Sequence, residues 1–122
     1  MVALVLLSLL AEPATAPVPA PKEQAVQRIP LAGPLADRGA EVSGAAWYGD
    51  QLVFLPQFPR KELFALPKES ILAHLAGEHA KPLTPRRIPF HSGGIEDGIA
   101  GFQGFEAIAF HGRRVFLAIE SG

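Results

Sequence analysis

The chain has 122 residues, a formal net charge of −1 and 48% apolar residues, which fits one small globular domain and gives no basic surface for nucleic acid. It contains no cysteine, so disulfide frameworks and thiolate metal sites are both excluded. Glycine and proline, twelve of each, exceed ordinary usage, which predicts frequent turns and disfavours a long helical bundle.

The first residues are typical of an export signal. Residues 2–11 (VALVLLSLLA) are uncharged and apolar, and they are too few to cross a bilayer, whose hydrocarbon core requires about 20 residues. Small residues follow at Ala14 and Ala16, although no Lys or Arg precedes the apolar run. We predict a signal peptide over 1–16, a proline-rich linker over 17–40, and a periplasmic or secreted protein. A mispredicted start or an apolar arm is the alternative.

An internal repeat lies in the expected folded region, which begins near Glu41. Residues 42–57 (VSGAAWYGDQLVFLPQ) align without gaps with residues 105–120 (FEAIAFHGRRVFLAIE). Each copy predicts a β-hairpin, because Gly49 and Gly112 tolerate the positive φ of a tight turn between aromatic and β-branched positions. The second strand of each copy is apolar throughout, so both of its faces should be covered.

Three more elements are predicted between the two copies of the repeat. The pattern of residues 62–67 (ELFALP) predicts a third strand. The pattern of residues 68–77 (KESILAHLAG) predicts a short helix that ends at Gly77. Residues 86–90 (RRIPF) read as an outer strand, because Pro89 is tolerated at a sheet edge.

Four strands followed by a return of the first-strand motif describe a mainly β fold. We predict one four-stranded blade of β-propeller type over about 41–103, the inner hairpin of a second blade over 104–122, and one short inserted helix. The chain is then an incomplete, N-terminal part of a propeller, with exposed apolar faces that favour aggregation. A small α+β domain is the alternative. The aromatic residues of the repeat region are expected in the core between blades: Trp47, Phe102, Phe105 and Phe110.

Residues 44–59 (GAAWYGDQLVFLPQFP) and 104–122 (GFEAIAFHGRRVFLAIESG) resemble the blade-opening motif of the bacterial phytase-like, or esterase-like, β-propeller proteins. In that family an E-G-I/L-A motif precedes G-D or G-R and an apolar strand. This chain differs at Ala107, where the family usually has glycine, and at Ser43, which takes the place of the glutamate. The resemblance implies an exported protein and hydrolysis of phosphate or other esters.

Carboxylates provide the candidate site. Glu106 begins one strand of the second hairpin and Glu120 ends the other, so antiparallel pairing brings both to the open end. Asp97 and Glu96, in the preceding loop, would add to an all-oxygen cluster of the kind that Ca²⁺ prefers. We therefore predict Glu106, Glu120 and Asp97 as metal ligands. The alternative is that these carboxylates cap turns and accept bonds from backbone amides.

Nucleophilic catalysis has no support in the residues. The histidines lack the spacing of a zinc pair or a matching acid, and no G-x-S-x-G elbow is present. Whether the chain is an enzyme stays open. The main hypothesis is a phytase-like propeller that binds a small anionic ligand or a metal ion, with ester hydrolysis implied by the resemblance. The alternatives are a non-catalytic scaffold for a protein or polysaccharide, and an inactive fragment.

Overall fold

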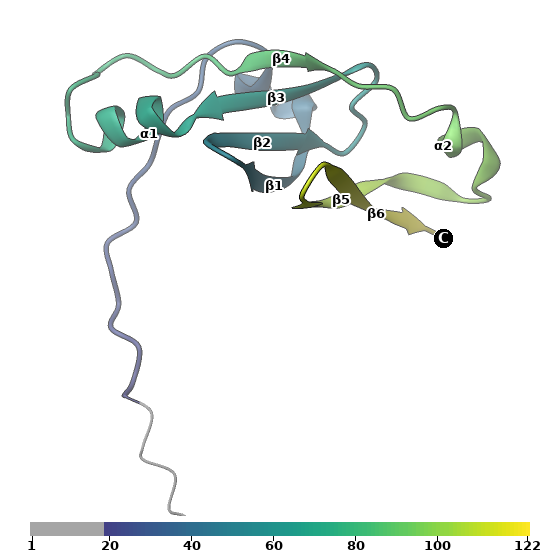
Figure 1. The fold of residues 1–122 in the computed structure, drawn as a ribbon, viewed down its shortest axis with the longest axis horizontal. Coiled ribbons are helices and arrows are strands. Elements are labelled where there is room, and N and C mark those ends of the chain that lie inside the picture. Colours follow the sequence, from purple (N-terminus) through teal and green to yellow (C-terminus); the bar gives the residue numbers. More distant parts are fainter. Residues whose placement is uncertain (1–18) are drawn as a thin grey trace, which may run out of the picture.

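The computed structural model describes residues 19–122, in which a four-stranded antiparallel sheet of order β1-β2-β3-β4 stands beside a two-stranded hairpin, β5-β6 (Figure 1). The mainly β fold predicted from the sequence, with one short helix inserted after the third strand, is confirmed. The predicted signal peptide over 1–16 lies outside the described residues. The elements are β1 (Val42–Tyr48), β2 (Gln51–Pro56), β3 (Glu62–Pro67), α1 (Lys68–Leu75), β4 (Arg86–Pro89), α2 (Ile95–Gly98), β5 (Phe102–His111) and β6 (Arg114–Ser121).

Both copies of the repeat form hairpins with two-residue turns. Tyr48 pairs with Gln51 across the first turn, and His111 pairs with Arg114 across the second. The glycine that begins each turn has a φ of 56°, a conformation that is costly for residues with a Cβ. The turn glycines therefore fix the same strand register in both copies.

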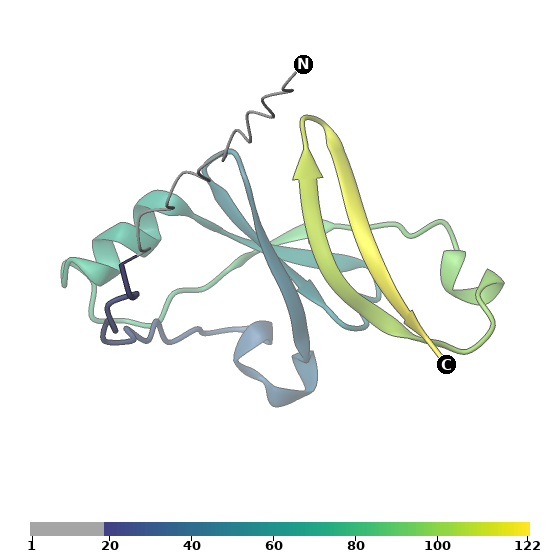
Figure 2. The ribbon, with the colours of Figure 1, turned by 90° about the horizontal axis from the view of Figure 1, so that it is seen from below.

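Helix α1 is short and lies on the far side of the sheet from the hairpin (Figure 2). It begins directly after Pro67, and Ile71 is its buried residue. Its end is set by Gly77, which has a φ of 80° and donates its amide to the carbonyl of His74 at 3.0 Å. This helix end is the one that the glycine predicts.

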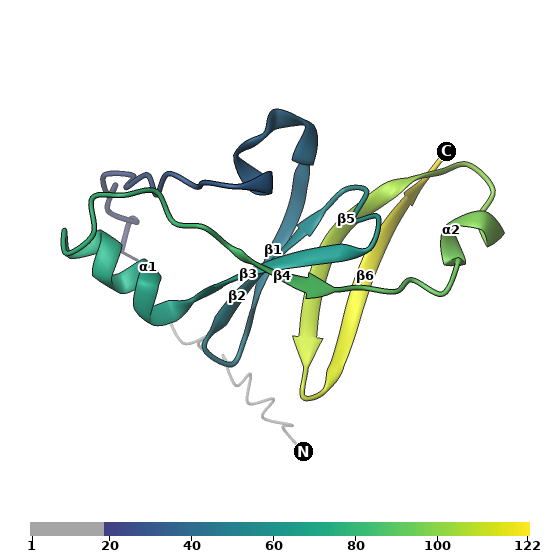
Figure 3. The same cartoon turned by 90° about the horizontal axis from the view of Figure 1, so that it is seen from above.

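The core lies between one face of the sheet and the hairpin. It combines four residues of β2 and β3 with two residues of β5: Val53, Leu55, Leu63, Ala65, Phe105 and Ile108. Gly44 on β1 permits the close approach, because a Cβ there would lie 3.2 Å from both Ala107 Cα and Ile108 N. In Figure 3, β5 lies next to β1 and β2, and α1 lies on the other side of the sheet. The two copies of the repeat thus stack on each other, with one face of each in contact.

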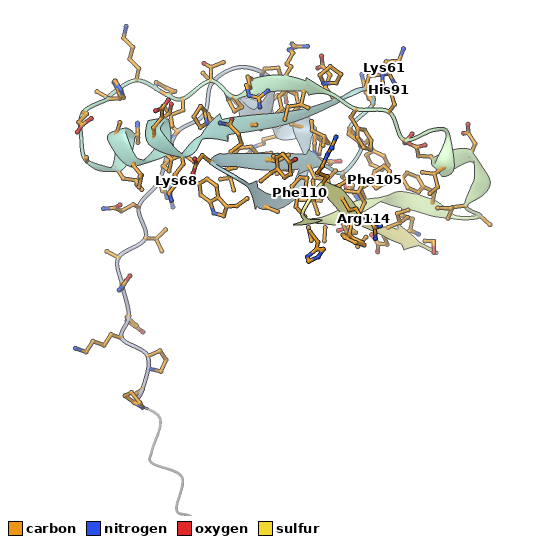
Figure 4. The ribbon with its side chains drawn as sticks, in the orientation of Figure 1. Lys61, Lys68, His91, Phe105, Phe110 and Arg114 are labelled. Atoms are coloured by element: carbon orange, nitrogen blue, oxygen red, sulfur yellow. The ribbon has the colours of Figure 1, made fainter. Side chains whose placement is uncertain are left out.

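The predicted aromatic core is confirmed for three residues and wrong for the fourth. Phe105 is 1% exposed, and Phe102 packs against the core from the hairpin. Phe110 packs there too, and Figure 4 labels it together with Phe105. Trp47, however, is 48% exposed. Because Ala46 packs against the core and successive strand residues face opposite sides, Trp47 points away from the hairpin.

The expectation that both faces of each second strand are covered fails for β6. Phe116 is 55% exposed on the face of β6 that points away from the sheet. The reason is geometric, since the hairpin meets the sheet with one face only, through residues such as Ile108 and Leu117. The other face of β6 has no covering layer among the described residues.

Packing begins earlier than the expected start near Glu41. Leu31 forms a parallel bridge with Leu83, and Leu35 is 8% exposed within a short 3-10 turn, Pro34–Ala36. A second 3-10 turn, Arg38–Ala40, leads into β1. Residues 19–30 therefore form no helix or strand, and packing begins at Leu31. The short helix α2 was not anticipated in the glycine-rich loop before β5.

Candidate functional site

The two predicted carboxylates of the hairpin lie at its open end. Glu120 is paired with Gly104, at the opposite end of the strands from the Gly112 turn. Glu106 sits at a register shift between Phe105 and Ala107, so it has no partner residue on β6. Such a bulge changes the direction of the side chain from the one it would have in a regular strand, where successive side chains point to alternate faces. Both side chains are exposed, and we call this region the carboxylate end.

Gln57, at the end of β2, ties the sheet to the carboxylate end. Its Nε2 donates to the carbonyl of Gln103 at 3.1 Å and to Glu106 Oε1 at 3.2 Å. Its main-chain carbonyl accepts from the amide of Phe105 at 2.9 Å. Gly104 has a φ of 134°, and a Cβ there would collide with the Gln57 side chain, so this contact requires glycine. Sequence reasoning missed Gln57, although the repeat aligns it with Glu120.

Ser43 holds the same junction from β1. Its Oγ donates to the carbonyl of Phe105 at 2.6 Å and lies 3.2 Å from the carbonyl of Leu55. The hydroxyl is thus engaged with main-chain oxygens of both copies of the repeat. Ser43 fixes the stacking of hairpin on sheet, and its proton is not directed at a general base.

The loop before β5 carries the other predicted carboxylates. Ser92 Oγ donates to Glu96 Oε2 at 2.6 Å. This hydrogen bond, together with one from the Glu96 backbone amide, lowers the pKa of Glu96 below its ordinary value of 4.5. Asp97 lies beside Glu96 in α2, near the end of the hairpin where β5 begins (Figure 1).

The described residues do not assemble these carboxylates into one coordination sphere. Within residues 19–122, no three His, Asp or Glu side chains gather closely enough to hold a metal ion. Glu106 and Glu120 share one end of the hairpin, whereas Asp97 comes from the separate turn of α2. The calcium site of Glu106, Glu120 and Asp97 therefore stays a prediction.

A groove that the sequence does not reveal lies at the end of the sheet where β2 connects to β3. Its volume is about 1030 Å³, and its walls come from residues 34–41 and from the connection between β2 and β3. Glu41 and Arg60 both line it, and both have a positive φ, of 43° and 53° respectively. Residues held in this conformation are strained and recur at binding sites. The groove is a second candidate ligand site.

Comparison of the chain with known proteins finds no similar protein. No protein-family model matches the chain, and neither the curated proteins nor the solved structures include a significant match. Over the part of the chain that the structure describes, no helix is long and apolar enough to span a membrane. Membership of the phytase-like propeller family therefore stays a prediction from the repeat motif.

Proposed function

We propose that the chain is an exported binding protein of β-propeller type, and that its carboxylate end takes the ligand. The observation that carries this proposal is the stacking of the two copies of the repeat, which brings Gln57 from one copy beside Glu106 from the other. Strand ends from neighbouring blades meet at one edge in the same way in a propeller, where such edges bind ligands.

The charge of the carboxylate end favours a cation as the first ligand. Among residues 19–122 the one ion pair is Arg87 with Glu62, so Glu106 and Glu120 have no basic partner there. Two exposed carboxylates repel an anion and attract a hard cation such as Ca²⁺. An anionic ligand, including a phosphate ester, would require a cation already bound between it and these side chains.

The engagement of the Ser43 hydroxyl favours binding over catalysis. Ser43 lies beside the carboxylate end, but its Oγ donates to a main-chain carbonyl. A serine nucleophile requires a base within hydrogen-bond reach of its hydroxyl. The ester hydrolysis implied by the family resemblance stays a prediction, and so does the alternative of a scaffold for a protein or polysaccharide.

Calorimetric titration of calcium into the full chain tests the proposal. The proposal expects binding by the wild type and its loss in the double variant Glu106→Gln, Glu120→Gln. Glu69→Gln is the matched control, because it removes an exposed carboxylate on α1, on the far side of the sheet from the hairpin. The proposal would be refuted if the wild type bound no calcium, or if the double variant bound calcium as tightly as the wild type does. Circular dichroism of each variant verifies that it is folded.

A further inference from the structure

The internal interface is built from two different faces of the same repeat. The front face of the first copy contacts the hairpin, and its residues are Gly44, Ala46, Val53 and Leu55. The back face of the second copy supplies the opposing surface, with Phe105, Ile108, Phe110 and Leu117. A front face of one copy thus stacks on a back face of the next, and the arrangement is directional.

Each copy also has the face that the other copy uses in the internal interface, and the alignment of the two copies identifies its residues. The second copy repeats the front face at Ala107, Ala109, Phe116 and Ala118. The first copy repeats the back face at Val42, Ala45, Trp47 and Phe54. Alternation along the strands places each set on the side of its hairpin that points away from the internal interface.

Both counterpart faces expose large apolar side chains, although α1 lies on the same side of the sheet as the back face of the first copy. Phe116 is 55% exposed at the front-face position that Val53 occupies, 4% exposed, in the first copy. Trp47 is 48% exposed at the back-face position of Phe110, which packs against the core. Val42 is 43% exposed at the position of the buried Phe105. At these three positions, an apolar side chain that packs in one copy has an apolar counterpart about half exposed in the other.

Two of the side-chain sizes on the second front face offset each other, whereas Ala107 places a Cβ where the first copy has Gly44. Phe116 is larger than Val53, and Ala118 is smaller than Leu55, so the gain in volume at one position offsets the loss at its neighbour. Volume-conserving changes of this kind are the ones that packed interfaces tolerate best. The chain therefore carries a second front face and a second back face that resemble those of its internal interface.

We propose that a second copy of this chain docks with its Trp47 back face on the Phe116 front face of the first, head to tail. The contact is heterologous, so each bound copy presents a new front face, and assembly continues as a filament or closes as a ring. This inference does not depend on ligand binding at the carboxylate end. It specifies how the exposed apolar faces associate, in place of the unspecific aggregation expected from sequence.

Sedimentation velocity of the full chain over a range of concentrations measures this association. We expect species larger than a dimer in the wild type, because a head-to-tail contact leaves a free face at each end. Trp47→Glu and Phe116→Glu should each weaken association by at least about tenfold, as a charge buried in an apolar contact does. Val26→Glu is the control, since Val26 is 88% exposed and lies outside both faces.

Mixing the two variants provides the decisive arm. The Trp47→Glu chain keeps its front face and the Phe116→Glu chain keeps its back face, so an equimolar mixture should form a dimer that grows no further. A wild type that stays monomeric, or a mixture that stays monomeric, overturns the proposal. The proposal is also overturned if the Trp47→Glu variant associates as strongly as the wild type. Association would then come from another contact, such as pairing between the β6 edges of two copies, and not from the back face. Asparagine replaces glutamate in any variant whose circular dichroism departs from that of the wild type.

Discussion

Replacing Phe105 by alanine should destabilise the protein more than almost any other single change. The side chain is 1% exposed and lies between the sheet and the hairpin. Its ring makes edge contacts with Phe90 and Phe102, with centroid distances of 6.0 and 5.3 Å. Alanine keeps the main-chain bonds to Gln57 and Ser43, so the change removes packing and leaves the polar links in place.

The expected loss in the free energy of unfolding is about 3–5 kcal/mol, the usual cost of a buried Phe→Ala change with its cavity. Small domains have total stabilities of about 5–15 kcal/mol, so Phe105→Ala removes a large part of the margin. The matched control is Phe116→Ala. Phe116 is 55% exposed, and in the monomer its replacement should change stability by no more than about 0.5 kcal/mol.

Urea unfolding followed by far-ultraviolet circular dichroism measures both variants. The protein concentration must be one at which sedimentation shows monomers, because association stabilises the folded chain. A loss below about 1 kcal/mol for Phe105→Ala, or equal losses for the two variants, would refute the reasoning that hairpin and sheet share one core.

Two further predictions follow from the junction and from the loop before β5. Gly44→Val should cost about 1–3 kcal/mol in urea unfolding, because its side chain meets the backbone of Ala107 and Ile108; an unchanged midpoint would mean that the strands do not approach closely. The pKa of Glu96 is lowered in the folded chain, so its stabilisation is present above the unfolded pKa and is lost as the pH falls through the folded value. Ser92→Ala should therefore raise the Glu96 pKa toward 4.5 in a carboxyl NMR titration, and an unmoved pKa would contradict the role of this hydrogen bond.

Local signals predicted the strands and the helix, whereas the choice of faces needed the tertiary structure. The run 62–67 gave β3 with its observed bounds, and Gly77 ended α1, because apolar periodicity and glycine conformation act within a few residues. The aromatic character of Trp47 suggested burial, but the hairpin stacks on the other face of β1. That choice depends on contacts between residues far apart in the chain.

The candidate site was predictable in part for the same reason. Strand pairing alone brings Glu106 and Glu120 to one end of the hairpin, and the sequence indicates that pairing through its turn glycine. Gln57 is a polar residue after an apolar strand, and nothing in its neighbourhood points to a bond with Glu106. Asp97 is close to Glu106 in sequence, yet α2 places it on a separate turn.

Amide hydrogen exchange of the full chain, read residue by residue by NMR, tests the stacking of the two copies most directly. The informative amide is that of Phe105, which donates to the carbonyl of Gln57 at 2.9 Å and so joins hairpin to sheet. If the copies stack as described, this amide should exchange as slowly as those in the ladder between β2 and β3. Rapid exchange at Phe105 beside a protected sheet would contradict the stacking, and with it the interface from which head-to-tail assembly is inferred.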